Sequence, residues 1–409
     1  MLVNSSISSS RARAETVSYG RFLFAFFAPL ACTIPFLAAS YAFLKNTGEL
    51  DSIEDIAAAQ RTTGALYGTA LHPNIYAYKL ALLHAADPEV VAIGSSRVLQ
   101  IRAGSFAQPF VNLGRTVNYP DEAVKLIDDM LAISRPRVAL LGVDFWWFNP
   151  GMKFAFTFDT HRVRGGELSS DALLAPVRWL LEGKLDARTF RDIATGGHPL
   201  RVEGVPMFGV QAGTRGNGFA GDGSYYYLGT VYGRSAAEDP RFADTLGRIA
   251  RNEGQFRRAE APDEERLARL KYAVARLEAA GVRVITFLPP VAGRVLAALR
   301  QDGDGYAYID RARRRLAEIG RHHYDFHDPA ILGAGDCEFV DGFHGGDVLF
   351  ARILERIGAD PDSGLAPYLN LEQLRSVIDN NKNRSLADDR YRRPGEKERD
   401  FLELGCDKS

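Results

Sequence analysis

The feature that most constrains the fold is the stretch of residues 88–104, PEVVAIGSSRVLQIRAG. Residues 90–93 are a continuous apolar run, typical of a strand buried on both faces of a parallel sheet. Gly94 breaks the run, and two serines, Ser95 and Ser96, precede a helix-like segment. The sequence therefore predicts a sharp turn that holds a serine hydroxyl at the carboxyl end of a sheet, where open α/β folds bind their ligands.

Two interpretations fit these serines. A serine caps a helix well, and from this stretch alone capping is the simpler one. The N–H groups of a helix start also suit an oxyanion, as a nucleophilic serine requires. A second stretch, residues 339–346 (FVDGFHGG), favours catalysis. Asp341 precedes His344 by three residues, so the carboxylate can fix the imidazole tautomer and leave the other ring nitrogen as a general base.

A serine at a strand-to-helix turn early in the chain and Asp-x-x-His late in it resemble the SGNH, or GDSL-like, hydrolase superfamily. The resemblance covers roughly residues 88–358 and makes Ser96 the nucleophile, His344 the base and Asp341 its orienting partner. Ser95 stands where that family has an aspartate before the nucleophile.

The resemblance also implies an oxyanion hole. Its expected donors are the N–H of Ser96 and the N–H of Gly114, which ends a VNLG block. Asp144 stands where the family has an asparagine, and an ionised carboxylate cannot donate a hydrogen bond. Asn149, a few residues further on, is the expected substitute.

Composition sets further limits. The 409 residues are 46% hydrophobic and 25% charged, which allows one large domain with additions or two domains. A net charge of −1 gives no general attraction to nucleic acid. The three cysteines predict neither a metal site nor a disulfide framework, and we expect no cofactor. Packing is favoured over a metal site for three histidines without a zinc-like spacing, His322, His323 and His327.

Residues 22–44 are a charge-free, mostly apolar run, long enough to span a bilayer as a helix. Arginines in the polar tail of residues 1–21 precede it, so the positive-inside rule predicts a cytoplasmic amino terminus and an exported remainder. A signal peptide cleaved near residues 40–42 (SYA) is the alternative. The length of the run favours an uncleaved anchor, which places a single-pass protein in the cell inner membrane with a periplasmic or extracellular domain.

The rest of the chain predicts a doubly wound α/β fold with a parallel sheet, of the three-layer SGNH or flavodoxin-like kind. Apolar strands alternate with amphipathic helices, except in a region rich in glycine and aromatic residues. The expected parts are lead-in helices at 46–87, the α/β domain at 88–360 with a loop-rich insertion at about 150–260, and a terminal helix and disordered tail at 361–409.

Aromatic residues near the predicted site are candidates for substrate binding. Trp146 and Trp147 follow a buried strand, and Tyr225 lies in the insertion. The tryptophans would belong to a sugar- or acyl-binding wall, with packing at least as strongly favoured, and Tyr225 would contact substrate, with packing as an equal alternative.

The Gly-Ser-Ser-Arg sequence and the single anchor are similar to one group within the superfamily, which includes alginate O-acetyltransferases and the D-alanyl-transfer protein of teichoic-acid synthesis. The resemblance implies an exported polysaccharide O-acyltransferase or esterase that works beside a multi-span membrane acyltransferase. The alternatives are a simple exported esterase or lipase, and a non-catalytic carbohydrate-binding partner.

Overall fold

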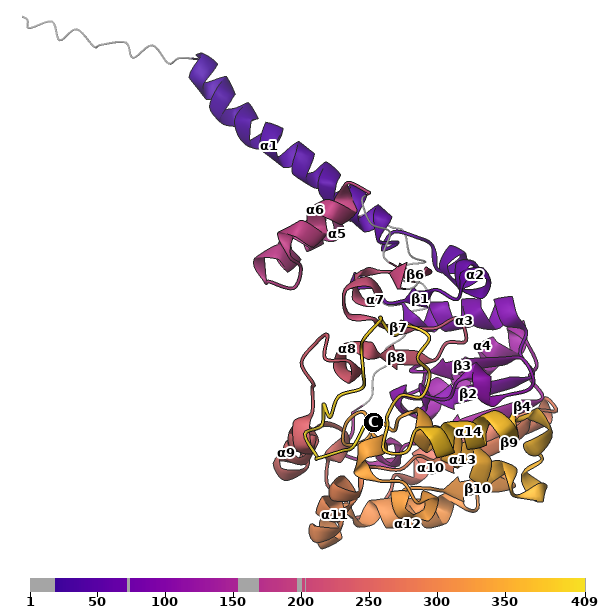
Figure 1. Cartoon of the computed structure of the whole chain (residues 1–409). Coiled ribbons are helices and arrows are strands. Elements are labelled where there is room, and N and C mark those ends of the chain that lie inside the picture. The colour runs from indigo at the N-terminus through magenta and orange to yellow at the C-terminus, as the bar shows by residue number, and fades with distance from the viewer. Residues whose placement is uncertain (1–18, 72–73, 154–168, 197–200, 203, 409) are drawn as a thin grey trace, which may run out of the picture. The chain divides into compact units, whose positions relative to one another are not determined.

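A computed structural model describes residues 19–71, 74–153, 169–196, 201–202 and 204–408 (Figure 1). The chain forms two compact units, which we call the helical unit and the α/β unit. The helical unit comprises Met1–Leu44 and Ser169–Gly197, and the α/β unit comprises Lys45–Leu168 and His198–Ser409.

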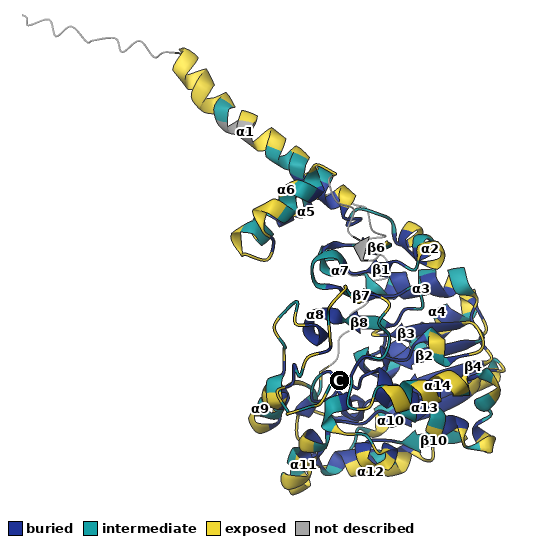
Figure 2. Ribbon diagram, viewed as in Figure 1, coloured by how far each residue is buried: buried dark blue, intermediate teal, exposed yellow. Residues whose placement is uncertain are grey.

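The helical unit contains α1 (Tyr19–Asn46), α5 (Ser170–Leu181) and α6 (Ala187–Ala194). By length and composition α1 is able to cross a membrane, and residues 19–27 at its start are all exposed (Figure 2). The predicted apolar run of residues 22–44 lies within this helix.

The α/β unit is built on the predicted parallel sheet, in the order β10-β9-β4-β2-β3. Counted along the chain this is 2-1-3-4-5, a doubly wound order in which β2 has a neighbour on each side. A crevice opens at the carboxyl end of such a strand, where the connections leave in opposite directions. The strands are β2 (Val90–Gly94), β3 (Phe110–Gly114), β4 (Val138–Gly142), β9 (Arg283–Leu288) and β10 (His322–Asp325).

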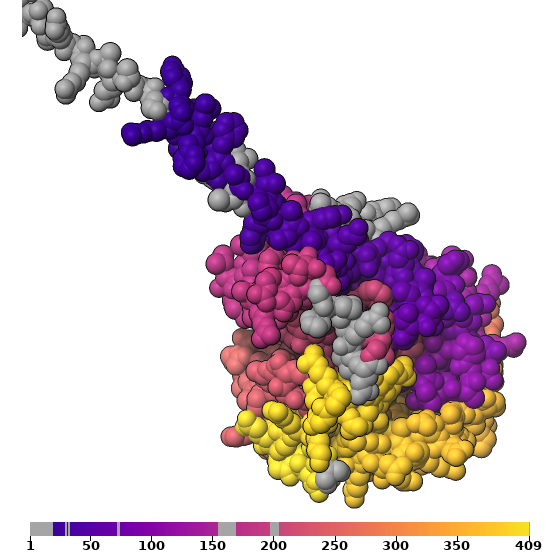
Figure 3. Space-filling view, turned by 45° about the horizontal axis from the view of Figure 1, so that its top comes forward, coloured from indigo at the N-terminus to yellow at the C-terminus, as the bar shows by residue number. Residues whose placement is uncertain are grey.

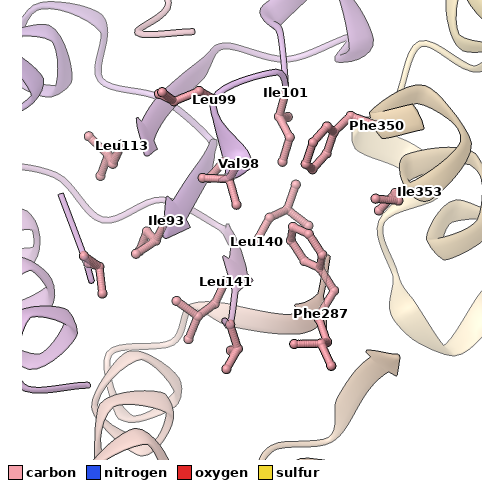
Figure 4. Packing of buried hydrophobic residues seen from close by; sticks show 14 of the residues in the cluster. Ile93, Val98, Leu99, Ile101, Leu113, Leu140, Leu141, Phe287, Phe350 and Ile353 are labelled. Carbon is pink, nitrogen blue, oxygen red and sulfur yellow. The ribbon is translucent and has the colours of Figure 1, made fainter. Parts of the chain in front are cut away.

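Helices cover both faces of this sheet. Right-handed crossovers put α4 and α10 side by side on one face, where Arg269 and Arg276 of α10 form ion pairs with α4. On the other face α13 packs over the segment after β2, with Phe350 close to Ile101 of that segment (Figure 4). The helices are α4 (Pro120–Ile133), α10 (Glu264–Ala279), α11 (Gly293–Gln301), α12 (Ala307–Leu316), α13 (Asp347–Gly358) and α14 (Leu371–Asn380).

The lead-in segment and the insertion together form a second, mixed sheet in the order β5-β6-β1-β7-β8. The sequence predicts only helices for residues 46–87, whereas β1 of that segment pairs with β6 and β7 of the insertion. The strands are β1 (Leu66–Tyr67), β5 (Arg201–Val202), β6 (Val205–Phe208), β7 (Asn217–Phe219) and β8 (Tyr225–Tyr227). The helices around them are α2 (Ile53–Thr63), α3 (Ile75–Ala86), α7 (Val210–Arg215), α8 (Leu228–Val231) and α9 (Ala243–Arg251).

The expectation of a disordered tail after α14 is wrong. Residues 381–408 pack on the α/β unit and appear in yellow across one of its faces (Figure 3). Tyr391 and Leu402 are fully buried, and the buried carboxylate of Glu398 accepts hydrogen bonds from Ser385 and Lys408. The polar composition that suggested disorder is satisfied by partners elsewhere in the fold.

A disulfide also fixes this tail. Cys406 is bonded to Cys337, with 5.8 Å between their Cα atoms, and the bond closes a loop of 69 residues. The sequence indicated no such pairing, because the spacing of three cysteines does not identify partners.

Replacing Cys406 with serine removes this covalent link. A cross-link over a loop of this length stabilises a fold by about 2–4 kcal/mol, mainly by restricting the unfolded chain. We expect Cys406→Ser to lower the free energy of unfolding of the α/β unit by that amount in urea denaturation. Wild type measured with a reductant should match the variant, and equal stability of the reduced and oxidised wild type would contradict the prediction.

Two histidines, the half-buried His323 and the buried His327, make the fold sensitive to acid. His323 on β10 has its Nδ1 atom 2.9 Å from Thr286 Oγ1, and burial lowers its pKa to about 4. Burial also lowers the pKa of His327, whose ring packs on Phe145. Their packing is the role that the sequence favoured for these histidines.

Because the pKa of His323 is lower in the folded state, the unfolded chain binds more protons between pH 6.5 and 4. Above pH 6.5 the ring is neutral in both states, and its titration does not reduce the free energy of unfolding. By pH 4 protonation of the unfolded chain has lowered this free energy by about 3 kcal/mol. We expect His323→Gln to flatten the fall of the unfolding free energy over this range. The exposed His84→Gln is the control, and an unchanged slope in the first variant would refute the assignment.

Candidate active site

Three side chains predicted to act together form a continuous hydrogen-bonded chain. Ser96 Oγ lies 2.8 Å from His344 Nε2, and His344 Nδ1 lies 2.6 Å from Asp341 Oδ2. This is the order of nucleophile, base and carboxylate that acyl-transfer triads require. Ser96 is partly exposed, whereas Ser95 is buried.

The turn that carries Ser96 depends on a close approach between strands. A Cβ atom on Gly94 would lie 2.9 Å from the carbonyl oxygen of Gly142 on β4, so a larger residue would displace the turn. Ser95 Oγ accepts a hydrogen bond from the N–H of Arg97, so Ser95 is the residue that caps the turn. Ser96 is left to face His344.

The helix expected after Ser96 is only a 3-10 turn, Ser96–Val98. The reason lies in Asn112 on β3, whose side-chain amide donates to the carbonyl oxygens of Val98 and Ile101 at 2.8 and 2.9 Å. In a longer helix these carbonyl oxygens would accept hydrogen bonds from the N–H groups of the next turn. Because they accept from the Asn112 side chain instead, the helix ends here. The segment therefore lacks the N-terminal field of a long helix.

The loop of residues 339–346, which we call the His loop, is held in a tight turn. Asp341 Oδ1 accepts the N–H groups of Phe343 and His344 at 2.9 and 2.8 Å, and Val340 N–H donates to the His344 carbonyl at 2.8 Å. Burial alone would raise the pKa of Asp341, but the adjacent imidazole and these hydrogen bonds hold it below its ordinary value. A charged carboxylate therefore orients the ring at neutral pH.

Arg97 joins the serine turn to the His loop. Its guanidinium, in a residue only 1% exposed, donates to the Phe343 carbonyl at 2.8 Å and to the carbonyls of Pro289 and Pro290 at 2.8 and 2.6 Å. Its remaining nitrogen, Nη1, forms an ion pair with Asp144 Oδ1 at 3.1 Å. One side chain thus fixes both ends of the Ser96–His344 contact, a role that the sequence did not indicate.

Two of the three expected oxyanion donors are already engaged. The N–H of Gly114 donates to Asn112 Oδ1 at 2.7 Å. The side chain of Asn149 is buried and donates to the Arg257 carbonyl at 2.5 Å. The Ser96 N–H has no acceptor within the described chain, so it alone of the expected donors is open to a ligand.

The two tryptophans do not form an exposed binding wall. Trp147 is fully buried in the core, and Trp146 is almost fully buried, with its ring 6.2 Å from that of Phe343 in an edge-to-face arrangement. Trp146 also lies under the Arg97 guanidinium at 5.5 Å. Trp146 therefore packs against the His loop and Trp147 in the core, which is the packing alternative.

Tyr225 does lie near the triad, through its neighbour on β8. The rings of Tyr225 and Tyr227 are 4.7 Å apart, and that of Tyr227 is 6.5 Å from His344. Tyr225 N–H donates to the Leu99 carbonyl at 3.0 Å, and Lys79 Nζ bridges Asn112 on β3 to the turn before β8. The second sheet is therefore bound directly to the serine turn.

Sequence reasoning missed Arg115. Its N–H donates to the Ser95 carbonyl at 3.0 Å, and its backbone adopts a left-handed conformation with φ of 68°. The exposed guanidinium makes no hydrogen bond or ion pair with the described residues, and its charge acts on Tyr225 and Tyr227. Strained, exposed residues beside a site often serve function, but one arginine after a VNLG block is no recognisable signal.

No cluster of three or more histidine, cysteine or carboxylate residues that could hold a metal ion occurs in the part of the chain that the structure describes. Comparisons with protein-family models, curated proteins and solved structures find no match to this chain. The function is therefore argued from the geometry of the site.

Removing Arg97 would leave Asp144 buried and unpaired. Such a loss costs about 3–5 kcal/mol of stability, because the remaining charge keeps its desolvation penalty. We expect Arg97→Met to destabilise the protein by that amount in urea denaturation, and the double variant with Asp144→Asn to recover a substantial part. Additive losses in the double variant would contradict a direct coupling between the two side chains.

Proposed function

We propose that this protein is a membrane-anchored serine esterase or O-acyltransferase of the SGNH type. Its substrates would be acyl esters, in the simplest case acetyl esters, of a cell-surface polysaccharide. The observation that carries the proposal is the chain of hydrogen bonds from Ser96 through His344 to Asp341. A fold has no packing reason to align a partly exposed serine, an imidazole and a carboxylate in this order.

The proposed reaction has two steps. Ser96 Oγ attacks the ester carbonyl while His344 Nε2 accepts its proton, and the collapsing intermediate expels the alcohol with that proton. Water or an acceptor hydroxyl then attacks the acyl-serine, again with His344 as base, and regenerates Ser96. Asp341 keeps Nδ1 protonated and stabilises the imidazolium.

The oxyanion would form beside two groups. The Ser96 N–H is available to donate to the oxyanion. The second group is the guanidinium of Arg115, a residue whose backbone N–H is hydrogen-bonded to the Ser95 carbonyl. Such fixed donors stabilise charge that develops in the transition state. Arg115 and the tyrosines of β8 are also the candidate contacts for the acceptor or acyl group.

The proposed location is the cell inner membrane, with α1 as a single span and the α/β unit outside the cytoplasm. The length and apolarity of α1 support a span, and the basic residues before it support this orientation. The Cys337–Cys406 disulfide fits an oxidising compartment. A multi-span acyltransferase as the acyl donor remains part of the proposal.

A second candidate is a non-catalytic carbohydrate-binding partner of such an acyltransferase. The hydrogen bonds that engage Gly114 and Asn149 favour it, because they leave fewer oxyanion donors than a hydrolase normally has. A simple esterase or lipase differs from both candidates in needing no polymer. Reaction with a fluorophosphonate separates the catalytic candidates from the binding protein, since labelling needs an activated serine but no polysaccharide.

We expect full-length protein in detergent to hydrolyse p-nitrophenyl acetate and to be labelled by a fluorophosphonate at Ser96. Ser96→Ala should abolish labelling, and His344→Ala or Asp341→Asn should lower kcat by about 10³–10⁴-fold, because the triad acts as a unit. The matched control is Ser95→Ala, which should keep most of the activity. Wild type that neither labels nor exceeds Ser96→Ala in hydrolysis would favour the binding protein.

A further inference from the structure

The helices α5 and α6 have no part in the site, yet they expose large apolar side chains. Leu181 is 85% exposed and Leu174 is 49% exposed, both on α5. Trp179 and Leu180 are half-buried on the same helix. Soluble proteins seldom leave several such side chains together in water, so this surface suggests an apolar neighbour.

These helices pack against α1 through a specific aromatic contact. The ring of Phe190 on α6 is stacked on that of Phe36 at 6.1 Å and tilted against that of Phe43 at 5.2 Å, both on α1. Phe36 and Phe43 are two turns apart, so α6 follows the last third of α1.

The length of α1 then fixes the level of this contact. Residues 22–35, which precede Phe36, number 14 and rise about 21 Å as a helix, less than the roughly 30 Å of a hydrocarbon core. A span made of α1 must therefore continue past Phe36. Phe190, stacked on Phe36, would lie at the depth of the outer acyl chains or headgroups.

We infer that α5 and α6 form a hairpin that lies in the membrane interface beside α1, with Leu174 and Leu181 in contact with lipid. The inference rests on the membrane anchoring in the proposed function. Continuity with the α1 span identifies the lipid bilayer as the occupant of this surface. Interfacial helices bury an apolar face about 5–10 Å deep while long charged side chains reach the aqueous phase.

Charge indicates the kind of lipid surface. Residues 169–196 carry four basic and four acidic side chains, so their net charge is zero. The hairpin therefore has no general preference for anionic headgroups and would be held by apolar burial. The basic residues are Arg178, Lys184, Arg188 and Arg191, and the acidic ones are Asp171, Glu182, Asp186 and Asp192.

Trp179 provides a direct test, since the other two tryptophans, Trp146 and Trp147, are buried in the α/β unit. Full-length protein is reconstituted in phosphatidylcholine vesicles with or without mid-chain brominated acyl groups, and the emission of Trp179→Phe is subtracted from that of wild type. We expect bromolipid to quench the Trp179 emission at least twofold, equally at low and high salt. Unquenched Trp179 emission that is accessible to aqueous acrylamide would overturn the inference.

A variant pair tests the apolar contact. Leu174→Asp combined with Leu181→Asp should abolish quenching of Trp179, whereas Tyr272→Asp, at a 49% exposed position on α10, should not. Hydrolysis of a soluble ester should stay unchanged in both. Emission shielded from acrylamide but unquenched by bromolipid would overturn the inference in favour of a protein neighbour or a second copy.

Alkaline carbonate extraction and ester hydrolysis, measured on the same vesicles, separate the failures. Protein that resists extraction without quenching refutes the hairpin alone. Extractable protein refutes both the anchor and the hairpin. Quenching without hydrolysis leaves the hairpin intact and refutes only the catalytic part of the proposed function.

Discussion

The arrangement of the site depends on one buried guanidinium. Arg97 follows the candidate nucleophile directly, and it donates to three carbonyl groups that come from the end of β9 and from the His loop. A buried cation is costly unless its charge and all its donors are matched, and Asp144 provides the countercharge. Because these hydrogen bonds and this ion pair must all form, the electrostatics of the core determine where the His344 imidazole lies relative to Ser96.

A second buried pair extends the same principle to the periphery. Arg102 forms a 2.8 Å ion pair with Asp347, the first residue of α13, and its guanidinium stacks on Tyr226 at 3.7 Å. Tyr226 in turn donates to Asp388 of the C-terminal segment at 2.6 Å. The serine turn, the second sheet and the end of the chain are thus linked by polar contacts that must form together, because each leaves a buried charge if broken.

The sequence was most informative where local pattern and tertiary role coincide. Apolar runs located β2, β4 and β9 of the parallel sheet, and the spacing of Asp341 and His344 predicted their contact. It was least informative where a side chain acts at long range. Asn112 shortens the expected helix, and the partners of Glu398 turn an apparently disordered tail into packed structure. Such effects depend on residues that only the fold brings together, so no local window contains them.

The bonds around the C-terminal segment have a consequence for the order of assembly. Cys337 lies four residues before Asp341, and the Asp347 N–H just after the His loop donates to the Ser385 carbonyl at 2.7 Å. Both flanks of the loop are therefore completed by residues that follow it in the chain. A nascent chain that already holds Ser96, His344 and Asp341 still lacks these restraints, so the triad becomes fixed only after Ser385 and Cys406 have been added and have folded back onto the loop.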